Sequence, residues 1–267
     1  MVKLDRECDR PGAAIRFVDP GGEGQPIVFT HGAGMDHTVF LVQAHAAQLA
    51  GHRPILWDLR GHGASLLKPG ARFTACDALD DLGALLDACG GERPILVGHS
   101  LGGNLSQAFV RRHPDRVRGL IAVDSTWNTG PLTRAERFGL RLADPMLGMV
   151  PARRLPRLMA KASAVRPDAV AEIEAVLSRM PARSFLDVWR ATASLVDPDP
   201  AYRIPVPLGL IRGAADRTGN ISSAMPRWAR AEGVRERVID GAGHVVTLDA
   251  PEETAAALLS IVEEMTA

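Results

Sequence analysis

One stretch decides the fold of this chain: Arg93-Pro94-Ile95-Leu96-Val97-Gly98-His99-Ser100-Leu101-Gly102-Gly103-Asn104. Its apolar run Ile95–Val97 is typical of a strand that is buried on both faces. The following residues, Leu101–Arg112, place apolar side chains at helical spacing. Between strand and helix lies a G-x-S-x-G pattern centred on Ser100. A serine at such a turn has a strained backbone, rises above the sheet edge and faces the first N–H groups of the helix. The alternative is a solvated serine in an ordinary glycine-rich turn.

The composition indicates a globular protein with enough apolar material for a large core. The chain has 267 residues, of which 46% are hydrophobic, so it can form one core with or without an insertion. Its 31 basic residues balance its 31 acidic residues, so no overall field attracts nucleic acid or an anionic membrane. No apolar run reaches the roughly 20 residues of a membrane span. The charged residues Lys3, Asp5 and Arg6 do not form the apolar core of a signal peptide. We therefore expect a cytoplasmic protein with no nucleic acid or membrane partner.

Cysteine usage and motif content predict neither a metal nor a cofactor. The three cysteines, Cys8, Cys76 and Cys89, are odd in number and lack metal-site spacing, which favours a reducing compartment. The sequence contains no H-E-x-x-H pattern and neither of the glycine-rich patterns that bind nucleotides. Its oligomeric state stays open between monomer and homodimer.

Strand and helix patterns alternate along most of the chain. Strands are expected at residues 13–18, 26–30, 53–58, 95–97, 120–123, 206–212 and 236–239. Helices are expected at residues 38–50, 74–89, 101–112, 221–232 and 251–265. This alternation predicts an α/β fold with a mostly parallel central sheet covered by helices on both faces. The loops at the carboxyl ends of its strands are then expected to form the site.

Residues 126–198 interrupt the alternation. They lack strand signals, contain frequent prolines, and include short helical patterns such as Asp168–Met180 and Ser184–Leu195. We therefore expect a core made of residues 1–125 and 199–267, with residues 126–198 as an inserted helical unit. This unit has more basic than acidic residues. Two readings are open: a solvated surface, or contact between Arg134, Arg137 or Arg190 and an anionic substrate group.

Four strand-end loops contain candidate chemical groups, and three of these groups follow in the order Ser100, Asp216, His244. The sequence around them resembles the α/β-hydrolase family over essentially the whole chain. The matching pieces are His31-Gly32-Ala33-Gly34, Asp58-Leu59-Arg60-Gly61-His62-Gly63-Ala64-Ser65, Gly98-His99-Ser100-Leu101-Gly102-Gly103, Gly213-Ala214-Ala215-Asp216 and Gly241-Ala242-Gly243-His244. The resemblance implies the α/β-hydrolase fold, with a helical cap after the sixth strand, where residues 126–198 lie.

The chemistry of the three groups agrees with a serine hydrolase. A serine hydroxyl is a poor nucleophile until a base removes its proton. An imidazole is a suitable base because its unperturbed pKa is about 6.5, and a carboxylate fixes the imidazole tautomer. We therefore expect Ser100 as nucleophile, His244 as base and Asp216 as the acid. Asp124, which follows the sixth strand, is the alternative acid because the family uses both positions.

The oxyanion hole and the substrate pocket are expected around the same loops. The N–H of Leu101 directly follows the nucleophile, and the resemblance assigns the second donor to the Ala33 N–H. Substrate-binding residues are expected in the loop after the strand 26–30 and in the cap: Gly34, Met35, Trp127, Phe138, Phe185 and Trp189. Structural roles are expected for His31 and His99, and no chemistry for Asp58 and His62.

Three functions remain open. The first is hydrolysis of a small carboxylic ester, thioester or lactone through an acyl-enzyme on Ser100. The second uses the same triad for carbon–carbon bond cleavage beside a ketone, or for perhydrolysis. Val245 weakens the carbon–carbon reading, because many such hydrolases have an aromatic residue after the base. A serine nucleophile disfavours epoxide hydrolase and haloalkane dehalogenase activity, which use aspartate there. The third is a non-catalytic ligand-binding receptor, which would not need all three triad groups.

Overall fold

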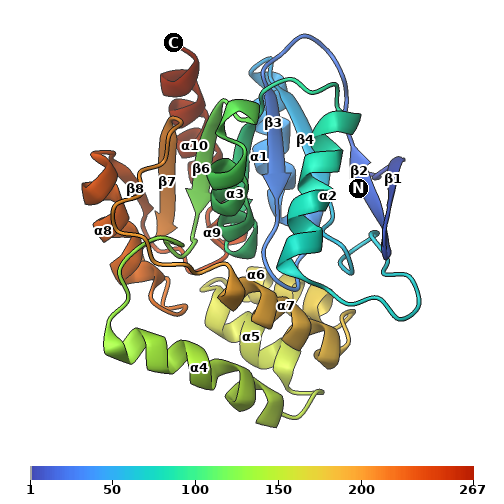
Figure 1. Cartoon of the computed structure of the whole chain (residues 1–267), viewed down its shortest axis with the longest axis vertical. Coiled ribbons are helices and arrows are strands. Elements are labelled where there is room, and N and C mark those ends of the chain that lie inside the picture. Colours follow the sequence, from blue (N-terminus) through green and yellow to red (C-terminus); the bar gives the residue numbers. More distant parts are fainter. Residues whose placement is uncertain (1) are drawn as a thin grey trace.

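The computed structural model describes residues 2–267, apart from the side chains of Arg141, Ala143, Asp144 and Pro145 (Figure 1). Within these residues the strands form one eight-stranded sheet in the order β1-β2-β4-β3-β5-β6-β7-β8. The strands are β1 (Arg6–Arg10), β2 (Ala13–Val18), β3 (Pro26–Thr30), β4 (Arg53–Trp57), β5 (Ile95–His99), β6 (Gly119–Val123), β7 (Leu208–Gly213) and β8 (Glu236–Ile239). β1 and β2 pair antiparallel, and all pairings from β4 to β8 are parallel. This arrangement confirms the predicted α/β class with a mostly parallel sheet.

Helices cover both faces of the sheet, so its central strands are buried on both sides. In β3, Ile27 and Phe29 pack with residues of α1 (Leu41–Leu49) and α10 (Pro251–Thr266). The intervening Val28 points to the opposite face, where it packs with residues of α2 (Ala75–Ala88) and α3 (Leu101–Arg112). Helix α8 (Ile221–Glu232) covers the same face beside β6 and β7.

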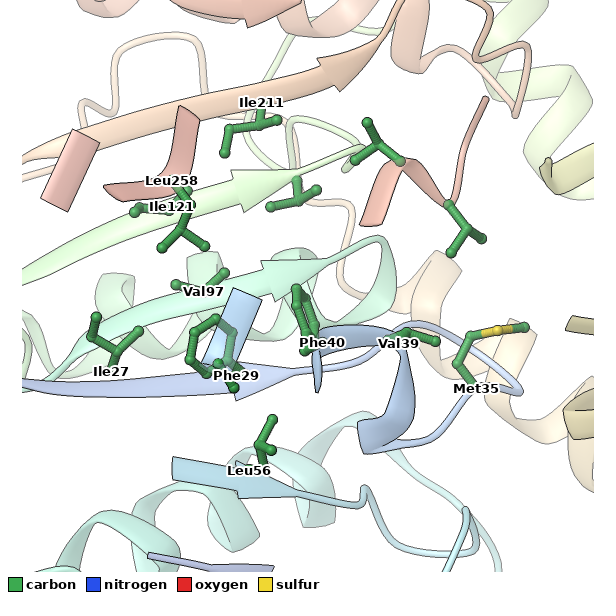
Figure 2. Packing of buried hydrophobic residues seen from close by; sticks show 14 of the residues in the cluster. Ile27, Phe29, Met35, Val39, Phe40, Leu56, Val97, Ile121, Ile211 and Leu258 are labelled. Carbon is green, nitrogen blue, oxygen red and sulfur yellow. The ribbon is translucent and has the colours of Figure 1, made fainter. Parts of the chain in front are cut away.

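The packing layer between the sheet and helices α1 and α10 holds the carboxyl ends of the central strands in place near the site. Figure 2 shows Phe29, Val97, Ile121 and Ile211 from four neighbouring strands in one continuous cluster with Leu258 of α10. All five side chains are fully buried. The carboxyl ends of β3, β5, β6 and β7 are thereby fixed relative to one another.

Residues between β6 and β7 form α4 (Arg134–Met149), α5 (Leu155–Ser163), α6 (Pro167–Leu177) and α7 (Ala182–Ser194). Helix α4 begins with a capping box, in which Thr133 and Glu136 satisfy each other's backbone N–H groups. Helix α6 begins at Pro167, a residue favoured at the first helical position. The four helices lie together beyond the carboxyl ends of the strands (Figure 1). Among residues 2–267, no helix combines enough length and apolar character to cross a membrane.

Most expected elements match closely, and helices 101–112 and 221–232 match the predicted bounds. Strand β1 escaped prediction because its sequence, Arg-Glu-Cys-Asp-Arg, is polar. It is an exposed edge strand that depends on pairing with β2. The one-turn helix α9 (Val246–Asp249) is too short for periodicity to reveal. Short 3₁₀ turns at His37–Phe40 and Pro114–Arg116 precede α1 and follow α3.

Candidate active site

Ser100 occupies the turn from β5 into α3 with backbone angles of φ 51° and ψ −116°. This is the left-handed region that non-glycine residues rarely adopt. The turn needs glycines because strand and helix approach closely. A Cβ at Gly98 would overlap the backbone of Gly102, and a Cβ at Gly102 would overlap the Thr30 carbonyl group. The G-x-S-x-G pattern thus acquires its physical meaning from the packing of β3, β5 and α3.

A continuous hydrogen-bonded chain joins the three residues expected to be catalytic. Ser100 Oγ lies 3.1 Å from Nε2 of His244, and Nδ1 of His244 lies 3.1 Å from Oδ2 of Asp216. Asp216 follows β7, and His244 lies in the loop between β8 and α9. Asp216 and His244 are 2% and 6% exposed, so their hydrogen bond is shielded from bulk water, whereas Ser100 is partly exposed. The fold brings together three groups that are up to 144 positions apart in sequence.

The surroundings of Asp216 favour its ionised form. Burial alone raises the pKa of this carboxyl, but the hydrogen bond and charge of His244 outweigh it. The Thr218 N–H adds a 2.7 Å hydrogen bond to Oδ1. The net pKa of Asp216 therefore lies below its usual value, which suits a carboxylate that accepts the Nδ1 proton of an imidazole.

A second carboxyl group, that of Asp124, lies next to this pair. One carboxylate oxygen of Asp124, one of Asp216 and one ring nitrogen of His244 all lie within 4.8 Å of one another. Asp124 is fully buried, and both its burial and the nearby Asp216 charge raise its pKa well above the usual value. Its Oδ2 has no hydrogen-bond partner among the described residues. The pKa values of the two carboxyl groups are therefore shifted in opposite directions: that of Asp216 is lowered and that of Asp124 is raised.

Two backbone amides near Ser100 are available as donors. Among the described residues, neither the Ala33 N–H nor the Leu101 N–H has a hydrogen-bond acceptor. Leu101 begins α3, where the helix leaves its first N–H groups unpaired. The loop that contains Ala33 lies against the nucleophile, because a Cβ at Gly32 would come within 3.2 Å of the Ser100 Cβ. Both amides are therefore free of acceptors within the described residues, and their role as an oxyanion hole remains a prediction.

Three buried histidines hold the loops of the site through hydrogen bonds to backbone groups. The sequence alone does not identify these backbone partners. His62 Nε2 accepts a hydrogen bond from the Gly34 N–H (3.1 Å), and His31 Nε2 accepts one from the Leu59 N–H (2.9 Å). His99 Nε2 donates to the backbone carbonyl of His244 (2.8 Å). Burial lowers the pKa of His62 and of His99 to about 3, so both rings are neutral near pH 7.

Asp249 is a further anchor that sequence reasoning missed. Its carboxylate accepts hydrogen bonds from the backbone N–H groups of Gly243 (2.7 Å), Val165 (2.9 Å) and Arg166 (2.9 Å). It therefore ties the loop that contains His244 to the segment between α5 and α6. The nearby Val245 N–H donates to the Ser163 carbonyl (2.8 Å), which reinforces the same connection.

Two cavities meet at Ser100. The first, the histidine-side cavity, has a volume of about 590 Å³ and is lined in part by Ala33, Met35, Ser100, Phe185, Trp189 and His244. The second, the α4-side cavity, has a volume of about 530 Å³ and is lined in part by Ser100, Leu132, Leu140, Trp189, Val196 and Ile221. The structure thus brings Met35, Phe185 and Trp189 to the cavities at Ser100. Gly34 is not itself a lining residue of either cavity; it packs against Leu177 and Phe185, which line the histidine-side cavity.

Two of the residues expected to bind substrate lie elsewhere. Trp127 is buried, but it stacks on Trp228 with a 4° interplanar angle and lines neither cavity. Phe138 is 65% exposed on α4 and also lines neither cavity. These two assignments are corrected: an aromatic residue in the inserted segment is apolar, but the sequence does not tell which neighbour covers it or whether it faces solvent.

Of the two readings of the arginines in the helical segment, the structure favours the solvated surface. Arg134, Arg137 and Arg190 line neither cavity. Arg137 donates to the carbonyl of Leu132, and Arg190 forms a 3.3 Å ion pair with Asp187. The basic residues that line the histidine-side cavity are instead Lys161 and Arg217.

Comparison with known proteins gives a family model and several similar sequences. A family model described as "Alpha/beta hydrolase family" matches residues 27–257. The chain is 28% identical over 251 residues to the 2-(acetamidomethylene)succinate hydrolase of Mesorhizobium japonicum, covering 91% of this chain and 89% of that protein. It is 32% identical over 135 residues to the 2-hydroxymuconate semialdehyde hydrolase of Pseudomonas sp. strain CF600, covering 49% and 47%. Matches to several other curated relatives also span less than half of the relative's length.

A solved structure gives the same answer for the fold. A thermophilic esterase from Thermogutta terrifontis superposes with a TM-score of 0.79, covering 95% of this chain and 94% of that one. Its sequence identity of 24% restricts the likeness to the architecture.

Proposed function

This chain belongs to the alpha/beta hydrolase family, and from that premise we propose that it is a serine hydrolase that cleaves a small carboxylic ester, thioester or lactone. The observation that supports this function most is the Ser100–His244–Asp216 chain, with both links at 3.1 Å. A nucleophile bonded to a base, with the base oriented by a third group, is the arrangement that activates a hydroxyl.

In the acylation step, Ser100 Oγ attacks the acyl carbon while His244 Nε2 takes the hydroxyl proton. The oxygen of the acyl group gains a negative charge, which the N–H groups of Ala33 and Leu101 stabilise by hydrogen bonds. The tetrahedral intermediate collapses to an acyl-enzyme. The leaving alcohol or thiol departs with the proton from His244. Asp216 stays ionised throughout and stabilises the imidazolium.

In the deacylation step, His244 takes a proton from water, and the resulting hydroxide equivalent attacks the acyl carbon. The second tetrahedral intermediate expels Ser100 Oγ, which recovers its proton from His244. The products are a carboxylic acid and the regenerated serine. No metal, cofactor or redox partner enters this sequence.

We assign residues 126–198 the role of a cap over this site. Phe185 and Trp189 of α7 and Met159 of α5 line the histidine-side cavity together with Ser100, which supports the assignment. The hydrogen bonds of Asp249 connect the cap segment to the loop of His244. A substrate would be enclosed between this cap and the carboxyl ends of β3, β5 and β7.

The experiment that tests the function measures hydrolysis of p-nitrophenyl esters with graded acyl chains by wild type and Ser100→Ala. We expect Ser100→Ala to lower kcat by roughly 10⁴-fold or more. A fluorophosphonate probe should label wild type and not Ser100→Ala. Ser222→Ala, on the exposed surface of α8, is the matched control and should be labelled like wild type. Equal labelling of wild type and Ser100→Ala would overturn the assignment.

Two further readouts separate the alternatives. Product analysis distinguishes ester hydrolysis from cleavage of a carbon–carbon bond, and added peroxide detects perhydrolysis. Saturable ligand binding without turnover by any of these routes would favour the receptor. Activity that is lost in EDTA and restored by zinc would overturn the cofactor-free mechanism.

A further inference from the structure

Ser100 lies in a wall that two cavities share. Trp189 and Thr218 also line both cavities, so a molecule bound at Ser100 can extend into each of them. With volumes of about 590 and 530 Å³, both cavities have room for a substituent. An acyl carbon held at Ser100 Oγ therefore has space on two sides, and the question is which half of the substrate occupies which side.

The chemistry at Ser100 distinguishes the two sides. A tetrahedral intermediate on Ser100 Oγ has three other groups: the oxyanion, the leaving-group atom and the acyl substituent. His244 must reach the leaving-group atom to protonate it, and His244 lines the histidine-side cavity. Ala33, the expected oxyanion donor, lines the same cavity. Neither residue is among the described residues that line the α4-side cavity. That cavity is therefore left for the acyl substituent.

The α4-side cavity suits an apolar acyl chain. Leu140, Val196 and Ile221 contribute aliphatic side chains to its wall. Glu136 is the acidic residue in this wall, and its charge is already compensated by Arg227 (3.0 Å) and by the amide of Asn220 (2.8 Å). An apolar chain therefore meets aliphatic surface on one side and a neutralised carboxylate on the other.

The histidine-side cavity has a different electrostatic character. Lys161 and Arg217 line it, and no acidic side chain of the described residues does. Both cations are exposed, and neither has an ion-pair partner within the part of the chain that the structure describes. Two uncompensated positive charges at one cavity attract an anionic group, with an energy that salt screens.

We propose that the substrates of Ser100 are acyl compounds with two chemically different halves: an apolar acyl chain in the α4-side cavity and a leaving group with a carboxylate or another anionic substituent in the histidine-side cavity. The inference rests on the proposed serine hydrolase function and adds a substrate class to it. Lys161 and Arg217 are then specificity-determining residues, and they take no part in proton transfer.

The first arm of the test fills the α4-side cavity. Gly139 of α4 lines it, and an added Cβ there meets no heavy atom within 4 Å, so Gly139→Leu can begin a side chain without a backbone clash and adds volume to the wall. Ala193 of α7 also lines this cavity, and Ala193→Phe fills it from the α7 side. Gly148→Leu is the matched control, because Gly148 lies in the same helix, is equally open and lines neither cavity.

The readout of this arm is the kcat/KM ratio for p-nitrophenyl octanoate over p-nitrophenyl acetate. We expect both filling variants to lower this ratio at least about tenfold, as expected when a pocket rejects several methylene groups. Gly148→Leu should leave the ratio within about twofold of wild type. An unchanged ratio in both filling variants would overturn the acyl assignment.

The second arm compares the butyrate ester of 4-hydroxybenzoate, which has an anionic leaving group, with the butyrate ester of its neutral methyl ester. Lys161→Gln and Arg217→Gln should each raise the KM ratio of anionic to neutral substrate about threefold or more at low salt. The effect should shrink in about 0.5 M NaCl, because salt screens exposed charges. Arg134→Gln, an exposed cation that lines neither cavity, is the control and should behave as wild type.

A third substrate set separates failure of the inference from failure of the proposed function. Hydrolysis that does not depend on Ser100 refutes the proposed function, and the substrate class with it. Ser100-dependent hydrolysis in which Arg217→Gln penalises p-nitrophenyl hydrogen adipate, whose anion is on the acyl side, refutes only the orientation proposed here. So does a filling variant that penalises long alkyl alcohols in butyrate esters in place of long acyl chains.

Discussion

The backbone N–H of Gly213 donates a 2.8 Å hydrogen bond to Oδ1 of Asp124, so the carboxyl group that follows β6 is anchored to the last residue of β7. Asp124 is held there with a φ of 42°; Ser100 is the other non-glycine residue of the described chain with a positive φ. Strained residues of this kind cluster at functional sites. Asp124 thus occupies a fixed position behind the triad, while Asp216 makes the hydrogen bond to His244.

This arrangement predicts different outcomes for the two aspartates. Asp216→Asn should lower kcat by on the order of 10⁴, as in a serine protease, because an amide favours the wrong imidazole tautomer. Asp124→Asn should lower kcat by at most about tenfold, because Asp216 and not Asp124 bonds to His244, and an amide preserves the shape of Asp124 and its acceptor for the Gly213 N–H. Steady-state kinetics on both purified variants, with circular dichroism to verify folding, makes the comparison. The reverse order of effects would make Asp124 the triad acid.

The raised pKa of Asp124 has a consequence for stability. Its pKa is raised in the folded state, so between about pH 4 and that raised value the folded protein binds more protons than the unfolded chain. The contribution of Asp124 to stability is therefore fully present below its unfolded pKa and is lost as the pH rises through the folded value. Asp124→Asn removes this loss. Its stability relative to wild type should improve with rising pH, by up to about 1.4 kcal/mol per pH unit.

Urea unfolding of wild type and Asp124→Asn from pH 4 to 8 measures this trend. Asp115→Asn, an exposed aspartate after α3, is the control and should show a constant difference from wild type. A constant difference for Asp124→Asn as well would mean that Asp124 is ionised in the folded protein.

The anchor role of Asp249 predicts a linked loss of stability and activity. Asp249→Ala leaves three backbone N–H groups near Gly243 and Val165 without their acceptor, so we expect a loss of about 3 kcal/mol or more in the free energy of unfolding. Because Gly243 precedes His244, kcat should fall as well. Glu263→Ala, at an exposed position of α10, should stay within about 0.5 kcal/mol of wild type. A loss of stability without any change in kcat would restrict Asp249 to a structural role.

The glycines of the Ser100 turn can be separated from ordinary helical glycines. Gly102→Ala brings a Cβ into the backbone of Thr30, so we expect a destabilisation of about 3 kcal/mol or more, or an insoluble protein. Gly83→Ala in α2 meets its nearest neighbour at an ordinary 3.6 Å and should stabilise the protein by up to about 1 kcal/mol. Thermal unfolding of the two variants tests this contrast. Equal stability of both would show that β3 and α3 can separate to accommodate the methyl group.

Local pattern was sufficient for the architecture and for the candidate triad. The alternation of apolar strands and helices predicts a sheet covered on both faces. Glycines two positions before and after Ser100 indicate a turn in which a strand and a helix pack closely. Ser100, Asp216 and His244 each follow a strand pattern in the sequence, which predicts that all three lie at carboxyl ends of strands. These features are written into neighbouring residues, so they can be read without knowledge of long-range contacts.

Other features depend on which distant residues pack together, and only the tertiary structure decided them. Asp124 and Asp216 look alike in sequence, but burial and the charge of Asp216 raise the pKa of Asp124, whereas the contacts with His244 and Thr218 lower the pKa of Asp216. Trp127 is a large aromatic residue of the kind that lines pockets, but it stacks on Trp228 of α8. Lys161 is one basic residue among many in the helical segment, and the placement of α5 brings it to the cavity at Ser100. In each case the physical reason is the same: burial, charge compensation and cavity lining are properties of neighbours in space, which the order of residues along the chain does not specify.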